Sequence, residues 1–190
     1  MPIFIIEHLE PRLSKWCLIE YRHISEIAGK RNLWLANVKR ESERKKLAKY
    51  GKVTEKSASE LNLRNACILD PGAEKTLAPK EAKKFRYFIF GGILGDYPAK
   101  KRTKEKLTRF VKNAAARNIG KKQFSTDNAV YVVKQIVNGK SLQELKFKDR
   151  IEIQKNNVES FILPYRYALL NGKPLVSKEL IKFLKRKRGF

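Results

Sequence analysis

The sequence predicts an α/β protein built on a mostly parallel β-sheet. Two observations carry this prediction: short apolar runs rich in β-branched and aromatic residues, and longer segments in which apolar residues recur every three or four positions. The two kinds of segment alternate along most of the chain. Strands that alternate with helices form βαβ units, in which the strands run parallel.

The first βαβ unit begins at the N-terminus. Residues 3–6 form an apolar, β-branched run, and residues 13–28 follow with helical spacing until Gly29 ends the helix. Further strands are predicted at 33–36, 66–69 and 87–90. Between the first two of these, residues 39–56 are mostly charged, which predicts a solvated helix or a mobile basic arm.

Two more helices are predicted after the fourth strand. Thr103 is a suitable N-cap for a helix whose apolar stripe extends to Ala114. Ser125 or Thr126 caps the second helix, which ends at Gly139. Both helices continue the α/β alternation of the first half of the chain.

The pattern changes after about residue 140. Short strands are predicted at 151–153, 158–163 and 167–170. Asn171 and Gly172 are typical of a hairpin turn, and Ser177 caps a final helix with a very basic end. We therefore predict an α/β domain over 1–140, followed by a β-rich extension and a basic C-terminal helix over 141–190.

The charge of the chain is strongly positive. Lys+Arg 43 and Asp+Glu 19 give a net charge of +24 at pH 7. Such a surface attracts polyanions, because each phosphate that it neutralises releases condensed counterions. The charge favours RNA or an RNA–protein particle as a partner. The alternative is a lysine-rich surface with no specific partner.

The composition argues against several classes of protein. The longest apolar run, near residues 85–94, is shorter than the ~18–20 residues that span a bilayer, so we expect no membrane partner. The N-terminal apolar run is too short for a signal peptide. Cys17 and Cys67 show no paired spacing, and the sequence has two histidines, His8 and His23. These features predict a cytoplasmic protein with no disulfide and no metal site.

Three loops leave the carboxyl ends of predicted strands, where parallel sheets bind ligands. The first is Asp70-Pro71-Gly72. The second, 91–96, begins with Gly91-Gly92, and glycines let a backbone approach a ligand closely; a tight structural turn is the alternative. The third, 118–126, places polar side chains before a helix N-terminus, whose free N–H groups bind carboxylates. Ordinary helix capping is the alternative there.

Three side chains near the first strand are candidates for binding or acid–base roles. Glu20 falls within the apolar stripe of the first helix, and a buried carboxylate needs a partner or must face a cavity. A salt bridge or hydrogen bond to a neighbouring Arg or Tyr is the alternative. Glu7 and His8 end the first strand, and His8 is a candidate base, although a histidine there more often forms a simple hydrogen bond. No sequence signature of a catalytic nucleophile accompanies them.

Several motifs resemble one family. They are Ile5-Ile6-Glu7-His8, Cys67-x-Leu69-Asp70-Pro71, Phe88-x-Phe90-Gly91-Gly92-Ile93-Leu94-Gly95-Asp96-x-Pro98, Arg102-Thr103-Lys104 and Lys122-Gln123-x-x-Thr126-Asp127. In these motifs the chain is similar to the archaeal and eukaryotic branch of the SPOUT methyltransferases, which includes a yeast protein arginine methyltransferase. The resemblance extends to Gly172-Lys173-Pro174 and covers nearly the whole chain. It implies the SPOUT fold, with a trefoil knot within about 66–138.

The resemblance also implies S-adenosylmethionine as the cofactor, held in the knot by three loops. The matching cofactor-binding residues are Leu69, Asp70, Pro71, Gly91, Gly92, Ile93, Asn118, Ile119, Gly120, Gln123, Ser125 and Thr126. These are the same three loops that the sheet argument reaches from the residues alone.

The resemblance further implies methyl transfer to an arginine of a ribosomal protein. Carboxylates must then grip the guanidinium in a fork and help to remove its proton. The candidates are Glu7, Glu20 and Asp96, with His8 beside them to bind substrate.

Other activities stay open at this stage. SPOUT enzymes typically modify RNA, and an rRNA or tRNA methyltransferase would bind phosphate through Lys100, Lys101 and Arg102. An RNA-binding assembly factor that keeps the cofactor without turnover is a third hypothesis. We expect a monomer rather than a homodimer, because the extension after residue 141 can cover the helices through which many SPOUT domains dimerise.

Overall fold

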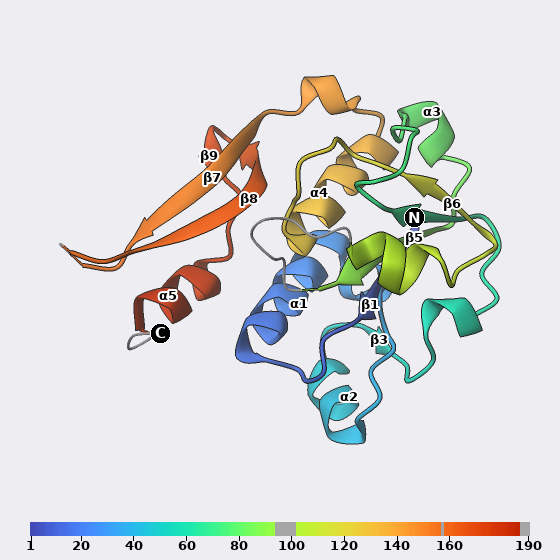
Figure 1. The fold of residues 1–190 in the computed structure, drawn as a ribbon, viewed down its shortest axis with the longest axis horizontal. Helices are drawn as coiled ribbons and strands as arrows, with labels where there is room; N and C mark the ends of the chain where they lie inside the picture. Colours follow the sequence, from blue (N-terminus) through green and yellow to red (C-terminus); the bar gives the residue numbers. More distant parts are fainter. Residues whose placement is uncertain (94–101, 157, 187–190) are drawn as a thin grey trace.

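The computed structural model describes residues 1–93, 102–156 and 158–186 (Figure 1). Within these residues a six-stranded parallel sheet has the strand order β3-β2-β1-β5-β4-β6. Its strands are β1 (Ile3–His8), β2 (Leu33–Ala36), β3 (Lys52–Val53), β4 (Ala66–Leu69), β5 (Tyr87–Gly92) and β6 (Ala114–Arg117). Its helices are α1 (Lys15–Ala28), α2 (Glu41–Leu47), α3 (Pro79–Ala82) and α4 (Thr126–Val137), with short turns η1 (Lys30–Asn32), η2 (Ala58–Glu60) and η3 (Lys104–Thr108). The predicted α/β class with a mostly parallel sheet is confirmed.

Each face of this sheet is covered by its own layer. Phe4 and Ile6 of β1 face α1 and α4, where they join one apolar core. Ile5 faces the opposite side and packs with residues of η2 and η3, including Leu107. Because successive side chains of a strand alternate, the last two residues of β1 also point to different layers. His8 faces α1, whereas Glu7 faces η2.

The structure corrects two predictions about this domain. Residues 39–56 form not one helix or arm but α2 and then the edge strand β3, which pairs with β2. The helix predicted from Thr103 to Ala114 is a single short turn, η3, and Ala114 begins β6. Alanines favour helices by propensity, but parallel pairing with β4 satisfies their backbone groups and overrides that preference.

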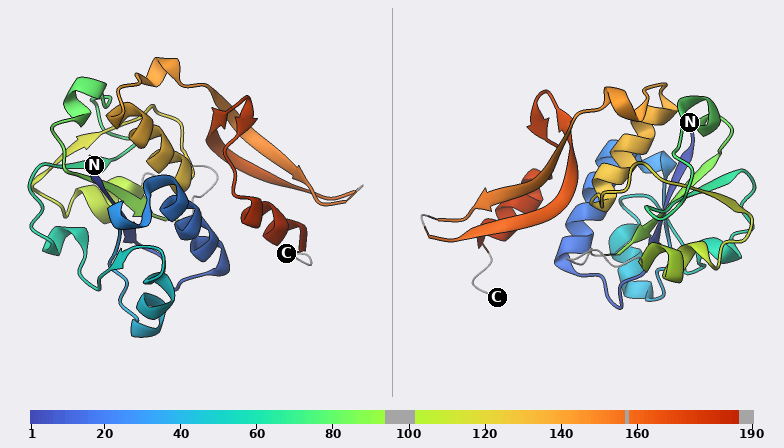
Figure 2. Two further views of the ribbon diagram at one scale, coloured as in Figure 1. Left: turned by 180° about the vertical axis from the view of Figure 1, so that it is seen from behind. Right: turned by 45° about the horizontal axis from the view of Figure 1, so that its top comes forward.

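The C-terminal extension is a separate antiparallel sheet with a helix against it (Figure 2). It contains η4 (Leu142–Glu144), β7 (Phe147–Gln154), β8 (Ser160–Leu170), β9 (Lys173–Pro174) and α5 (Lys178–Arg186). The two strands predicted at 158–163 and 167–170 are one long strand, β8, which a bulge in β7 allows to stay paired. Asn171 and Gly172 have φ angles of 51° and 77° and form the predicted hairpin turn.

The extension lies against the outer sides of α1 and α4. Its core joins Ile151 and Leu163 of the hairpin to Leu180 of α5 and to Ile19 of α1. Asn128 of α4 fixes the contact, because its side-chain amide donates to the carbonyl oxygen of Leu175 and its carbonyl accepts from the backbone N–H of Ala168. This contact places β8 and α5 beside the N-terminus of α4.

The segment between β6 and α4 is embedded in the loop that follows β4. Asn118 donates its backbone N–H to the carbonyl oxygen of Lys75, and its side-chain amide donates to that of Ala73. Its own carbonyl accepts from the backbone N–H of Leu77. These bonds hold the two segments side by side, and the trefoil knot expected within 66–138 stays a prediction. No helix among the described residues is long and apolar enough to cross a membrane.

Candidate functional site

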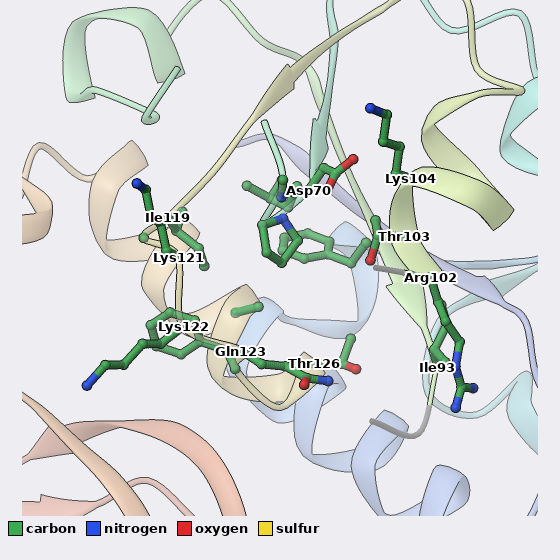
Figure 3. Close-up of a pocket in the computed structure, with 18 residues that line it drawn as sticks. Asp70, Ile93, Arg102, Thr103, Lys104, Ile119, Lys121, Lys122, Gln123 and Thr126 are labelled. Atoms are coloured by element: carbon green, nitrogen blue, oxygen red, sulfur yellow. Dashed lines mark hydrogen bonds between the residues drawn. The ribbon is translucent and has the colours of Figure 1, made fainter. Parts of the chain in front are cut away.

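A cavity of about 340 Å³ lies at the carboxyl ends of β4 and β5 and at the start of α4 (Figure 3). We call it the main cavity. Asp70 and Thr103 lie on one side of it, and Gln123 and Thr126 on the other. It has the size of pockets that hold small organic ligands. The three loops predicted from the sequence all contribute to its wall.

Internal hydrogen bonds hold the first and third loops in shape. Asp70 accepts a hydrogen bond from the backbone N–H of Gly72 at 2.8 Å and another from the hydroxyl of Thr108 at 2.7 Å. Its carboxylate therefore fixes the loop after β4 onto η3. Gly120 has a φ angle of 101°, where a side chain would strain the backbone.

Nine of the predicted cofactor-binding residues line the main cavity. They are Leu69, Asp70, Pro71, Gly91, Ile93, Ile119, Gly120, Gln123 and Thr126. The other three, which the structure also describes, have different positions. Asn118 holds the loop after β4, and Ser125 donates to Asp127. A Cβ on Gly92 would lie 2.6 Å from the Tyr21 hydroxyl, so this glycine allows α1 to approach the sheet.

The main cavity also has walls that the sequence reasoning did not assign. These residues are Gly72, Phe90, Thr103, Lys104, Lys121, Lys122, Phe124 and Ala129. Each lies within three residues of a predicted site residue, so extending the predicted segments would have found them. The side-chain amines of Lys104, Lys121 and Lys122 point away from the cavity. Arg102, predicted to bind substrate, lines the cavity beside Ile93.

A second, smaller pocket adjoins the main cavity; we call it the side pocket. Ile93, Phe124 and Thr126 line both. The remaining lining residues are Trp16, Ile19, Glu20, Ser125, Asp127, Tyr165, Tyr167, Ser177 and Leu180. It therefore lies where α1, the start of α4 and the extension meet, with Glu20 as one of its two carboxylates.

Glu20 binds the N-terminus of α4. Its carboxylate accepts a hydrogen bond from the backbone N–H of Thr126 at 2.9 Å, an N–H that is free of partners within the helix. Burial raises the pKa of Glu20 to about 8, and the negative charge of Asp127 adds to this effect. The side chain is thus mostly protonated at neutral pH in the empty pocket.

Asp127 is held in the opposite protonation state. Burial favours its neutral form, but a 2.7 Å contact with the His23 imidazole and hydrogen bonds from Ser125 and Asn128 outweigh it and lower the pKa of Asp127. The side pocket therefore contains one ionised and one protonated carboxyl group. Such pairs mark sites that bind cations or move protons.

The other predicted site residues lie elsewhere. Glu7 is buried on the opposite face of the sheet, where it accepts from the backbone N–H of Ala58 at 2.8 Å. His8 is buried against α1, with Nδ1 2.8 Å from the Tyr21 hydroxyl. Neither lines the main cavity or the side pocket. Asp96, Lys100 and Lys101 lie outside the described residues.

The main cavity suits the expected cofactor. Leu69, Ile93 and Ile119 provide apolar surface for an adenine ring, and the loops around them offer backbone groups for its edges. Arg102, which also lines the cavity, would be the cation for the carboxylate of a methionyl group. Among the described residues no group of three His, Cys, Asp or Glu side chains is placed to hold a metal ion.

Comparison with known proteins agrees with this geometry. Residues 3–189 match the model of a family described as protein arginine N-methyltransferase SFM1-like. Protein arginine N-methyltransferase SFM1 of Saccharomyces cerevisiae is 34% identical over 200 residues, which cover 96% of this chain and 94% of the yeast protein.

Solved structures give the same result. The yeast arginine methyltransferase SFM1 complexed with SAM superimposes with a TM-score of 0.87 and 34% identity, covering 97% of this chain and 90% of the other. A dual-specific Trm10 from Thermococcus kodakaraensis superimposes with a TM-score of 0.60 and 23% identity. The match covers 75% of this chain and 96% of the Trm10 chain, so the two share the SPOUT fold. With the family model matched over residues 3–189 and the yeast relative 34% identical over 96% of the chain, the chain belongs to the SFM1-like family of protein arginine N-methyltransferases.

Proposed function

We propose that this protein transfers the methyl group of S-adenosylmethionine to an arginine side chain of a ribosomal protein. Methyl transfer from S-adenosylmethionine is the activity of its family, and the yeast relative has been crystallised with that cofactor. The observation that carries the choice of arginine is the side pocket, in which two carboxyl groups lie next to the main cavity. A guanidinium carries a positive charge that these acids offset, whereas a neutral nucleotide base has no such charge.

The side pocket has a volume of about 30 Å³, so its walls must move apart to admit a guanidinium, but the groups that line it suit one chemically. Glu20 presents a carboxyl group that can accept its N–H groups, and Asp127, whose oxygens already bond to His23, Ser125 and Asn128, adds negative charge beside it. Trp16, Tyr165 and Tyr167 surround these acids with aromatic surface, which attracts a flat cation. Burial raises the pKa of Tyr165, so its hydroxyl stays protonated and can donate to Glu20 or to a substrate carbonyl.

Proton balance gives Glu20 its role. S-adenosylmethionine supplies an electrophilic methyl group on a positively charged sulfur. The attacking guanidinium nitrogen must lose one proton as it gains the methyl group, because its free pKa exceeds about 12. Glu20 loses its own proton to solvent when the cationic arginine enters the side pocket, because the cation favours the carboxylate. That carboxylate then accepts the proton that the nitrogen gives up as the nitrogen–methyl bond forms, and S-adenosylhomocysteine is the leaving group.

A labelling experiment tests both the activity and its target. Ribosomal particles from cells that lack this enzyme are incubated with the purified protein and methyl-labelled S-adenosylmethionine, then digested with RNase or with protease. We expect the label to survive RNase and to be released by protease, with methylarginine as the labelled residue after acid hydrolysis. Matched particles from normal cells serve as the control, because their target is already modified.

The alternative function is methylation of rRNA or tRNA. The net charge of +24 favours it, as does the fold shared with Trm10. In the same experiment, label that RNase releases and protease leaves would establish the RNA activity and overturn the proposal. Binding of cofactor with no label in either fraction would point to an assembly factor.

We also propose that the enzyme acts as a monomer. The extension covers the outer sides of α1 and α4, so these helices already bury their apolar residues within one chain. Sedimentation equilibrium is expected to give a mass near 22.1 kDa at micromolar concentration. A mass twice as large would contradict the proposal.

A further inference from the structure

We infer that helix α5 carries a binding surface for RNA phosphates on its exposed face, across the helix from the side pocket, and that the enzyme uses it to engage its substrate within an RNA–protein particle. The surface consists of Lys178, Lys182, Lys185 and Arg186, which we call the basic stripe. The claim that the stripe helps the enzyme to engage its substrate rests on the proposed function. The claim that the stripe binds RNA rests on the structure of α5 alone.

The basic stripe is a continuous cationic face. Its residues are spaced at i, i+4, i+7 and i+8, which places them on one side of a helix. All four are exposed. The acid on this helix, Glu179, pairs instead with Lys15 and Arg22 of α1. Within the described part of the chain, the stripe cations therefore have no ion-pair partner.

The other face of α5 is buried in the protein core. Leu180 and Leu184 are buried in the apolar core that the hairpin and α1 share. A basic helix binds a membrane by inserting its apolar face among the lipids, and this face is occupied. The stripe remains free to bind a polyanion in solution. Arg186 adds a guanidinium fork suited to phosphate oxygens.

The basic stripe lies across α5 from the side pocket. Ser177 and Leu180 line this pocket, and at 100° per residue the stripe residues fall on the opposite, exposed face of the helix. At 1.5 Å per residue, the stripe extends about 12 Å along α5. An RNA strand that follows the stripe would therefore run about one helix diameter, roughly 10 Å, from the side pocket.

Charge explains why an RNA contact helps this reaction. The protein carries a net charge of +24, and its substrate residue is a cation. Two positively charged proteins repel, which slows their association. RNA phosphates that bind the stripe neutralise part of the enzyme's charge and so lower its repulsion for a cationic substrate. The particle is thus a better target than the isolated protein.

The test measures RNA binding directly. The probe is a fluorescein-labelled hairpin of 20 RNA base pairs, followed by anisotropy between 50 and 300 mM NaCl. The stripe variant replaces Lys178, Lys182, Lys185 and Arg186 by Gln. The control variant replaces Lys75, Lys80, Lys83 and Lys84 by Gln, which removes the same charge from exposed positions around α3, at the opposite end of the molecule (Figure 1).

We expect the stripe variant to bind the hairpin at least tenfold more weakly at 100 mM NaCl. The slope of log affinity against log salt should fall by about 3, because up to four phosphate contacts are lost. The control should lose less than threefold. Equal losses in the two variants would overturn the inference. So would wild-type protein that binds phosphatidylserine vesicles more tightly than RNA and loses this binding in the stripe variant.

Methylation then links the stripe to the substrate. The rate on intact ribosomal particles is divided by the rate on the same proteins stripped of RNA. This ratio should fall about tenfold in the stripe variant and stay unchanged in the control; an unchanged ratio in both would refute the particle half of the inference. If wild-type protein methylates neither substrate, the proposed function fails, and the hairpin measurement still decides whether the stripe binds RNA.

Discussion

Glu7 and Glu20 are two buried carboxyl groups on opposite sides of the same sheet. They differ in whether they line a pocket. Both have a raised pKa, about 7 for Glu7 and about 8 for Glu20, in each case because burial disfavours the charge. Both accept one backbone N–H at the start of a helical segment. Glu20, however, lines a pocket beside the main cavity, whereas Glu7 is 4% exposed and lines neither.

This comparison teaches that a perturbed pKa identifies a functional group only together with access to a ligand. Burial is the main cause of the raised pKa at Glu7, where the carboxyl group accepts a hydrogen bond from the first residue of the turn η2. At Glu20 the same shift acts on a group that a guanidinium can reach. The following predictions, in order of decreasing effect, test this division between a structural and a catalytic carboxyl group.

The largest effect is expected for Glu20→Gln. We expect kcat/KM to fall about 10²–10³-fold, because the amide cannot accept the guanidinium proton. Its oxygen can still accept the N–H of Thr126, so cofactor affinity, measured by calorimetry, should change less than threefold. Glu7→Gln is the matched control and should lower kcat/KM by less than threefold. A similar loss of activity in both variants would remove the distinction.

The pH dependence should report Glu20 as well. In the free enzyme the pKa of Glu20 is about 8, and the ionised form is the active one. We therefore expect kcat/KM to rise roughly 50-fold between pH 6 and pH 8, with a slope near one in the lower half of that range. The limb for kcat should lie at lower pH, because bound arginine favours the carboxylate. Glu7→Gln should leave the pH profiles of kcat and kcat/KM unchanged. A shift of either profile in this variant would contradict the assignment of the pH dependence to Glu20.

The two glycines at the end of β5 extend the comparison to the backbone. A Cβ on Gly92 would lie 2.6 Å from the Tyr21 hydroxyl and 2.9 Å from the backbone oxygen of Glu7, so Gly92→Ala should destabilise the protein by about 1–3 kcal/mol. Gly91→Ala meets only the tip of Ile93, at 3.3 Å, on the wall of the main cavity. It should leave stability within about 0.5 kcal/mol and weaken cofactor binding several-fold. Urea denaturation and calorimetry separate the two outcomes, and equal stability of the two variants would contradict the packing argument.

The smallest effect concerns the stability of Glu7→Gln. The pKa of Glu7 is about 7 in the folded protein and about 4.3 in the unfolded chain. The folded state therefore binds the proton more tightly, and protonated Glu7 adds stability. This contribution is complete below pH 4.3 and is lost as the pH rises through 7. The neutral amide avoids this loss, so the variant should be more stable than wild type at pH 8 by about 1–2 kcal/mol. This corresponds to a rise in Tm of about 2–6 °C. The difference should vanish near pH 4.5, and a difference independent of pH would exclude ionisation of Glu7 as its cause.

Local patterns were sufficient for the strands and the loops of the site. The apolar runs of β1, β2, β4 and β5 and the turn at Asn171 are visible in the sequence because each depends on neighbouring residues. β6 was missed because Ala114–Arg117 is a strand only by pairing with β4. The N-cap predicted for Ser125 was also incomplete. Ser125 occupies that position, but the free N–H of Thr126 is bound by Glu20 from another helix.

The sequence by itself determined the α/β class, the resemblance to the SPOUT methyltransferases and the three loops that form the main cavity, because motifs and periodicity are local properties. It also marked Glu20 as a carboxylate misplaced on an apolar helix face. Only the tertiary structure decided that Glu20 shares a pocket with Asp127, that Glu7 faces the opposite layer, and that the extension completes the pocket with Tyr165 and Tyr167. These facts depend on contacts between residues 51 to 106 positions apart, and on the burial, charges and hydrogen bonds that set the pKa of each acid.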